Sequence, residues 1–393
     1  MISILILDEE RAYAALLAER LAAAGREFSV TANPPAADDT APVSDGVRAE
    51  YDFVIMSESA LARFAGRAGD APGGARLIVL SESPQAPERA AGTDQGILYI
   101  SRCGRVSALA AMIRAEYAVR PGSAGFARAF AGGAVKYIGC FGLAGGCGSS
   151  SVAIGIGRDF AAYKGRRVLY LSFESLEAGS LCVRDAEGER HIGDFMYLML
   201  RKRDADLRLF SEACLFRDSY GLARFFPSPG LNDLARASPE ETGDFLRFFD
   251  GCGAFDIIVL DFGSECGGAA RELMHLCDVL VLAENGSLRD AGKRARAEAF
   301  AREAWRSDGE PVFAENMTPL SYDGDPREDG EIADTADDAD YKTETADAKN
   351  RITIDFDEAS FRTLDGMTDF VLSGEFGLGI HKLTDILLAR ICG

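Results

Sequence analysis

The chain has 393 residues, 47% of them apolar and 26% charged, a composition typical of a globular protein with room for two domains. Its net charge of −20, with no basic patch, argues against a nucleic-acid partner. The 9 cysteines form no CxxC pair and the 3 histidines lie far apart, so we expect neither a zinc site nor a disulfide framework, and a reducing cytoplasm fits best. No apolar stretch approaches the roughly 20 residues that span a bilayer. The acids that follow the apolar start predict a buried strand rather than a signal peptide.

The first 120 residues alternate strand-like and helical patterns. Such alternation is typical of a doubly wound α/β domain, with a parallel sheet covered on both faces. Proline and glycine then predict a linker at residues 121–134. Strands are predicted at residues 3–8, 28–32, 51–59, 75–83 and 96–102, and helices at 11–25 and 107–119.

Polar residues follow several of these strands. They are Asp8, Glu9 and Glu10 after the first, Ser57 in the third, Ser81 in the fourth and Arg102 after the fifth. In this arrangement residues 1–120 resemble a response-regulator receiver domain. Ser57 stands where that family has its phosphate-accepting aspartate, so the resemblance implies a pseudo-receiver used for docking. The acids alone are also consistent with a solvated turn before a helix N-terminus.

Residues 135–393 form the second predicted domain, which begins with an apolar strand and the stretch "CFGLAGGCGSSSVA" from residue 140. A strand, a Gly-rich loop and a helix direct backbone N–H groups and a helix N-terminus at one point, which favours an anion. Glycine allows close approach to phosphate, and a hydroxyl at Ser150 can bind Mg²⁺. The predicted cradle comprises Gly145, Gly146, Cys147, Gly148, Ser149, Ser150 and Ser151.

This loop departs from the G-x-x-x-x-G-K-[ST] pattern in its charge. Leu143 replaces the first glycine and Ser149 replaces the lysine. Without a lysine, the loop alone is more typical of a plain strand-to-helix turn. Its phosphate-binding interpretation therefore depends on the rest of the domain.

Three later strands end in polar residues in the order that a nucleotide site requires. Glu174 follows a strand that ends in "YLSFES", Asp261 ends the apolar strand "FDIIVLD", and Asn316 ends "PVFAEN". Asp261 at the carboxyl end of a buried parallel strand predicts a second contact to Mg²⁺. Each residue also has a simpler interpretation: a surface acid, a helix N-cap and the start of a turn.

With these motifs, residues 135–393 resemble the MinD/ParA superfamily of P-loop ATPases. That resemblance implies an α/β domain that binds ATP and Mg²⁺, dimerises around the nucleotide and reads adenine with Asn316. It also implies that Glu174 orients water in any hydrolysis, although Ala144 and Ser149 replace both lysines of the family loop. Removing one charge-stabilising group costs about 10²- to 10³-fold in rate, so hydrolysis is expected to be weak or absent.

The whole chain is similar to TadZ/CpaE proteins of Flp (Tad) pilus assembly, through its N-terminal pseudo-receiver and stretches such as "GLARFFPSPGLNDL" and "TDFVLSGEFGLGIHKLTDILL". The implied function is that of a homodimeric localisation factor for pilus or secretion proteins. It would be cytoplasmic, at a cell pole or at the inner face of the membrane, with any membrane contact made through partners. Two alternatives stay open: a nucleotide-free scaffold whose loop is filled by Leu143 or Cys147, and a ParA-like partition ATPase.

Two further segments complete the chain. Residues 321–350 contain 11 acids and 3 bases, and this acidic composition predicts a disordered insertion. Apolar residues spaced along the C-terminal stretch from Gly379 predict a helix packed on the sheet, in preference to a membrane-surface helix.

Overall fold

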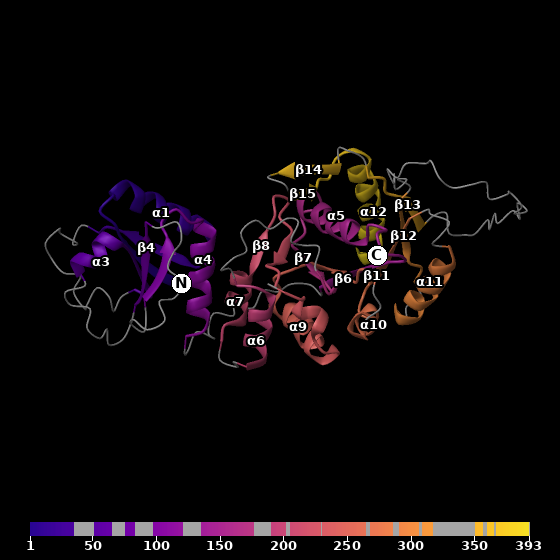
Figure 1. Cartoon of the computed structure of the whole chain (residues 1–393), viewed down its shortest axis with the longest axis horizontal. Coiled ribbons are helices and arrows are strands. Elements are labelled where there is room, and N and C mark those ends of the chain that lie inside the picture. The colour runs from indigo at the N-terminus through magenta and orange to yellow at the C-terminus, as the bar shows by residue number, and fades with distance from the viewer. Residues whose placement is uncertain are drawn as a thin grey trace, which may run out of the picture. The chain divides into compact units, whose positions relative to one another are not determined.

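The computed structural model of the chain is shown in Figure 1. It describes residues 1–34, 51–64, 75–82, 97–120, 135–176, 190–201, 205–228, 230–264, 268–285, 291–305, 309–316, 350–356, 360–364 and 367–392. Two compact units are formed, one from Met1–Ala127 with Tyr197–Cys214 and one from Arg128–Met196 with Leu215–Gly393. The acidic insertion predicted at residues 321–350 lies outside the described residues except for Asn350.

The first unit is built on a parallel sheet of 5 strands in the order β2-β1-β3-β4-β5. This is the flavodoxin-like order of doubly wound sheets. The predicted α/β class is therefore confirmed for this unit. Its strands are β1 (Ile2–Leu7), β2 (Phe28–Ala32), β3 (Phe53–Ser57), β4 (Arg76–Ser81) and β5 (Ile97–Ser101).

Helices cover both faces of this sheet because β1 is apolar on both sides. Ile2, Ile4 and Ile6 join a core with α1 (Arg11–Ala24) and α4 (Val106–Ala118). Leu5 and Leu7 face the other way, where the strands pack with α3 (Glu58–Phe64). Alternate residues of a strand point to opposite faces, so β1 is buried on both.

One segment of the first unit comes from the middle of the chain. The helix α7 (Leu207–Cys214) packs with α4, and Leu209 contacts the core that α1 and α4 share. The amide of Asp206 also donates to the carbonyl of Ala118 at 2.9 Å. The predicted boundaries assign this segment to the second domain, and the local pattern does not indicate where α7 packs.

The second unit contains a sheet of 8 strands in the order β13-β12-β11-β6-β10-β7-β9-β8, parallel except for the pair β8 and β9. The predicted α/β class is confirmed here too, and β13, which follows residues 321–350, pairs with β12 at the edge of the sheet. The strands are β6 (Lys136–Gly142), β7 (Val168–Ser172), β8 (Leu215–Arg217), β9 (Ala223–Phe225), β10 (Ile257–Asp261), β11 (Val279–Asn285), β12 (Val312–Asn316) and β13 (Arg351–Thr353). A separate hairpin pairs β14 (Phe361–Leu364) with β15 (Met367–Phe370).

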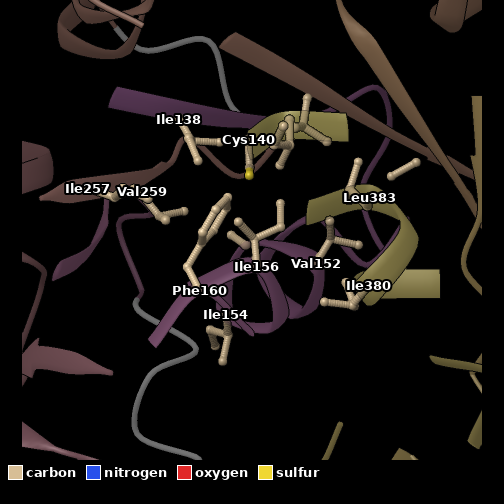
Figure 2. Packing of buried hydrophobic residues seen from close by; sticks show 14 of the residues in the cluster. Ile138, Cys140, Val152, Ile154, Ile156, Phe160, Ile257, Val259, Ile380 and Leu383 are labelled. Carbon is tan, nitrogen blue, oxygen red and sulfur yellow. The ribbon is translucent and has the colours of Figure 1, made fainter. Parts of the chain in front are cut away.

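Two helices cover one face of the larger sheet, α5 (Ser149–Ala162) and α12 (Gly374–Cys392). Figure 2 shows Phe160 of α5 beside Val259 of β10, and Val152 of α5 near Ile380 and Leu383 of α12. On the other face, the Phe141 ring of β6 meets Phe300 of α11. The remaining helices are α6 (Ile192–Arg201), α8 (Asp233–Arg236), α9 (Pro239–Cys252), α10 (Gly268–Met274) and α11 (Ala291–Trp305).

The C-terminal helix packs as predicted. Ile380, Leu383, Leu387 and Ile391 of α12 are buried in the core over the sheet. Residues spaced three and four apart share one helix face, which is why this stripe reaches the sheet. In the part of the chain that the structure describes, no helix has the length and apolar character needed to cross a bilayer.

Candidate functional site

The loop between β6 and α5 has the backbone that its glycines permit. Gly146 and Gly148 have φ of 75° and 85°, in the left-handed region that side chains disfavour. The loop is fixed to its neighbours, because Gly142 N–H donates to the Gly263 carbonyl at 2.7 Å and Leu143 N–H donates to the Ala283 carbonyl at 2.8 Å. The carboxyl ends of β10 and β11 thus hold the loop in place.

The start of α5 is suited to an anion. Gly148 is its N-cap, no side chain caps the helix, and its first turn contains no acid. First-turn N–H groups lack intrahelical acceptors, and the helix dipole favours negative charge there. Around Gly145 the closest contact for an added Cβ is the Ser264 hydroxyl at 3.9 Å, and around Gly146 nothing lies within 4 Å. The loop is therefore open around Gly145 and Gly146, whereas at Gly148 the Phe356 ring lies 3.1 Å from the position of an added Cβ.

Three residues predicted from separate motifs meet beneath this loop. The Ser150 hydroxyl donates to Glu174 Oε2 at 3.2 Å, and its interaction with the Asp261 carboxylate acts to lower the pKa of that acid. Ser150 comes from the first turn of α5, Glu174 from the end of β7 and Asp261 from the end of β10. Gly263, with φ of 58°, makes the approach possible, because a Cβ there would lie 2.6 Å from Glu174 Cγ.

Asp261 is completely buried and fully hydrogen-bonded. The Tyr170 hydroxyl donates to its Oδ2 at 2.7 Å, and Gly263 N–H donates to its Oδ1 at 3.0 Å. Burial raises the pKa of this carboxyl, while the bonds from Tyr170, Ser150 and Gly263 and the charge of Arg224 act in the opposite direction. The site therefore holds a carboxylate that has been withdrawn from water and oriented by donors.

Tyr170 and Arg224 are members of the site that sequence reasoning missed. They are directly paired between β7 and β9, and the Arg224 guanidinium lies 4.7 Å from the centre of the Tyr170 ring. Arg224 is 1% exposed. In the sequence, the arginine inside the apolar run "GLARFF" is the one signal that could have identified Arg224, because arginine is almost never buried without a partner.

The end of β7 is held by a third residue outside the predicted set. Asn232 is buried, and its amide donates to the carbonyls of Ser172 at 2.8 Å and Glu174 at 3.0 Å. It lies in the stretch "GLARFFPSPGLNDL", which carried part of the resemblance. Asn232 therefore fixes the backbone that presents Glu174.

Three arginines that follow the loop in the sequence, Arg158, Arg166 and Arg167, do not take the place of the missing lysine. Arg158 is buried in an ion pair with Asp218, with 2.7 Å between Nε and Oδ2. Arg166 and Arg167 precede β7, so they lie at the edge of the sheet opposite the loop, where Arg167 binds Asp256. At the lysine position itself, Ser149 is buried and uncharged.

The inner side of the loop is filled. Leu143 and Cys147 are 5% and 2% exposed, and a Cβ on Gly142 would lie 2.9 Å from Cys147 Sγ. Burial raises the pKa of the Cys147 thiol, against hydrogen bonds from the amides of Ala144 and Ser149. Cys147 therefore places a neutral thiol next to the amides of Ala144 and Ser149 in the loop.

The oxygen donors present fit Mg²⁺. Mg²⁺ prefers carboxylate, hydroxyl and water oxygens, and it is usually bound by one or two carboxylates together with phosphate. Ser150, Asp261 and Glu174 supply that set, while the described residues contain no cluster of three or more His, Cys, Asp and Glu side chains. Any ion here would complete its coordination with water and phosphate.

The other predicted residues have mixed outcomes. Ser151 lies half-buried in the first turn of α5, next to Ser150. Asn316 ends β12, beside Asn285 at the end of β11, but its side chain lies outside the described residues. Its adenine-binding role stays a prediction.

In the first unit, the acids after β1 are held by a cation. Arg102 Nη2 lies 3.1 Å from Asp8 Oδ1 and 2.9 Å from Glu10 Oε2. The Asp8 side chain is 1% exposed, so a fully solvated turn does not describe it. Ser57 is buried and its hydroxyl accepts from Ala60 N–H at 3.2 Å.

The fold and the site define an α/β protein with a strand, a glycine loop and a helix, β6 to α5, at the centre of its larger sheet. Among solved structures, a ParA family ATPase from Chlorobium tepidum TLS is similar, with 17% identity and a TM-score of 0.38 over 47% of this chain and 74% of that one. A putative plasmid partition protein from Borrelia burgdorferi B31 bound to AMPPNP has 11% identity and a TM-score of 0.40 over 66% and 100%. Cobyrinic acid a,c-diamide synthase from Mycobacterium smegmatis with bound ATP analog and magnesium has 14% identity and a TM-score of 0.40 over 66% and 96%. No family model and no curated protein matches the sequence.

Proposed function

We propose that the second unit binds Mg²⁺-ATP and that the nucleotide state, rather than turnover, controls docking to partners. The meeting of Ser150, Glu174 and Asp261 beneath an open glycine loop carries this proposal. The loop and the start of α5 bind phosphate through backbone N–H groups, and Ser150 and Asp261 hold Mg²⁺. Mg²⁺ supplies positive charge next to the phosphates, which the loop side chains lack.

The charge balance of the site supports binding with weak or absent hydrolysis. Two carboxylates face the loop, and Ser149 stands where a lysine would neutralise the phosphates. Backbone donors and a bound cation suffice for affinity, whereas hydrolysis also needs stabilisation of the charge that develops in the transition state. Glu174 is the residue that would orient water if a partner supplied such a charge.

For the biological role, we propose a homodimeric localisation factor for Flp (Tad) pilus or related secretion proteins. It would act in the cytoplasm or at the inner face of the membrane through its partners. This finer proposal rests on the resemblance of "GLARFFPSPGLNDL" and the C-terminal stretch, together with the pseudo-receiver interpretation of the first unit. Asn316 would contact the adenine.

Calorimetric titration with Mg²⁺-ATP tests the binding proposal. We expect Ser150→Ala to weaken binding about tenfold or more, which corresponds to about 1.4 kcal/mol for a lost ligand oxygen. Ser219→Ala is the control, because it removes an exposed hydroxyl of the second unit that lies outside the predicted cradle. Light scattering in the same samples reports dimerisation as a doubled mass. Absence of binding at millimolar ATP would refute the nucleotide proposal.

A nucleotide-free scaffold is the second candidate, and the buried Cys147 favours it. In that case the Cys147 thiol takes up the N–H groups of Ala144 and Ser149, which would otherwise be able to bind phosphate. We expect Cys147→Ala to change the Kd for Mg²⁺-ATP by no more than about threefold, because the outer side around Gly146 is already open. A gain of about tenfold or more, measured by the same titration, would show that the thiol blocks the cradle and would favour the scaffold.

A further inference from the structure

A row of three buried polar residues crosses three neighbouring strands of the larger sheet. They are Asp261 at the end of β10, Tyr170 in β7 and Arg224 in β9, and these strands are adjacent in the sheet. Tyr170 pairs directly with Arg224, and Asp261 stands two residues beyond Val259, the partner of Tyr170 in β10. Residues two apart in a strand share a face, so all three side chains lie on the face that α5 covers.

One hydrogen bond and one cation–π contact join the row. The Tyr170 hydroxyl donates to Asp261 Oδ2 at 2.7 Å. The Arg224 guanidinium lies 4.7 Å from the centre of the Tyr170 ring and 5.9 Å from that of Phe216. A cation over the face of a tyrosine is attracted to the ring, and in a low-dielectric core it polarises the hydroxyl into a stronger donor. The charge of Arg224 also acts on the Asp261 carboxylate.

Stability alone does not require an arginine at this position. Its neighbours Leu222, Ala223 and Phe225 are all buried, so Arg224 stands inside an apolar segment. Replacing buried charges with apolar residues of similar volume is often neutral or stabilising. A guanidinium here therefore points to a role in which its charge matters.

The charges of the candidate site explain what that role is. Asp261 and Glu174 are acids, and Ser149 is uncharged where a lysine would stand, so the phosphates need a cation such as Mg²⁺ between them and these acids. The direction of the Asp261 oxygens then decides how well the ion is held. Gly263 N–H holds Oδ1 at 3.0 Å, while the Tyr170 hydroxyl holds Oδ2. Groups that orient a metal-binding side chain commonly contribute about 10- to 100-fold to metal affinity.

We propose that Tyr170 and Arg224 are positioning residues for the Mg²⁺ of the nucleotide site. The Tyr170 hydroxyl orients Asp261, and Arg224 acts through Tyr170 by holding its ring and strengthening its hydroxyl as a donor. The assignment rests on the proposed binding of Mg²⁺-ATP. Both side chains are buried, so neither is expected to contact the nucleotide itself.

Calorimetric titration of ATP into the full-length protein, with Mg²⁺ and in EDTA, tests this assignment. The measured quantity is the Mg²⁺ effect, the Kd in EDTA divided by the Kd with Mg²⁺. We expect Tyr170→Phe to reduce the Mg²⁺ effect about fivefold to tenfold and to leave the Kd in EDTA unchanged within about twofold. A merely structural role would weaken binding equally in both conditions. Tyr170→Phe removes one hydroxyl and keeps the ring, so we expect it to fold.

Tyr137→Phe is the matched control for the loss of the hydroxyl. Tyr137 is a buried tyrosine of the same sheet, and its hydroxyl donates to Asp250 Oδ1 at 2.6 Å. It stands near the start of β6, whereas the glycine loop follows the end of that strand. We therefore expect the control to have the wild-type Mg²⁺ effect.

Variants of Arg224 test whether it acts through Tyr170. Arg224→Met keeps a long side chain without charge and should reduce the Mg²⁺ effect about threefold or more. Arg224→Lys retains a cation and should lie between Arg224→Met and the wild type. The double variant Tyr170→Phe with Arg224→Met should match Tyr170→Phe alone, because residues that act in series do not add.

The outcomes separate this assignment from the proposed function. No saturable binding of ATP to the wild type, or binding that Mg²⁺ does not strengthen, would refute both. Wild-type binding that Mg²⁺ strengthens, with an unchanged or larger Mg²⁺ effect in Tyr170→Phe, would overturn the positioning role alone. Additive losses in the double variant would show that Arg224 acts independently of Tyr170, which contradicts its assigned role.

Discussion

Replacing Asp261 with asparagine is expected to remove the effect of Mg²⁺ on ATP affinity. Asparagine keeps the shape of the side chain, but it lacks the charge that attracts the cation. We expect a loss of about 100-fold in the affinity measured with Mg²⁺ and little change in EDTA, since backbone donors still hold the phosphates. Calorimetry with and without Mg²⁺ measures both values. Equal losses in the two conditions would show that Asp261 shapes the loop instead of binding the ion.

The same variant should not be less stable at neutral pH. Burial raises the pKa of Asp261, so the folded state holds this proton more tightly than the unfolded state does. Asp261 therefore contributes to stability at pH values below the ordinary pKa of an aspartate. That contribution is lost as the pH rises through the raised pKa of Asp261 in the folded state. Asparagine has no charge to bury, and the Tyr170 hydroxyl can accept from its amide. A Tm clearly below that of the wild type at pH 7 would contradict this balance.

Replacing Asp218 with alanine is expected to cause the largest loss of stability. Arg158 and Asp218 have side chains that are 1% and 7% exposed, and Arg158 also donates to the Phe370 carbonyl. Removing one partner of a buried ion pair typically costs about 3–5 kcal/mol, because the other charge is left in the protein interior. The change is measured by urea unfolding followed through Trp305, a buried residue of the second unit.

Two controls separate the buried pair from ordinary surface effects. Asp244→Ala removes an ion pair with Arg247 whose side chains are 50% and 67% exposed, so it should cost about 0.5 kcal/mol or less. Arg158→Met combined with Asp218→Ala removes both charges and should recover part of the lost stability. A cost below about 1 kcal/mol for Asp218→Ala alone would mean that the pair is solvated in solution.

Much of the candidate site could be predicted because its residues lie at the ends of strands. Asp261 follows a run of apolar residues, and Glu174 and Ser150 stand next to equally clear breaks in pattern. The carboxyl ends of neighbouring parallel strands meet at one edge, so three separate motifs predicted one place. Their contact through the Ser150 hydroxyl agrees with that expectation.

The supporting residues could not be predicted in the same way. Tyr170 and Arg224 are 54 positions apart and become neighbours only because β9 pairs with β7 in one register. A shift of one residue would turn Arg224 to the other face. The association of α7 with the first unit has the same cause, since the packing of a short amphipathic helix depends on which surface is available.

The sequence by itself determined the α/β class, the glycine loop, the strand ends that carry polar residues and the core-facing stripe of α12. Each of these depends on residues close together in the chain, whose spacing sets the local backbone and the buried face. Only the tertiary structure decided that Arg158 pairs with Asp218 and that Arg224 lies against the Tyr170 ring. These features depend on strand register and helix packing between distant segments, where the surrounding core selects one of many arrangements that the local pattern permits.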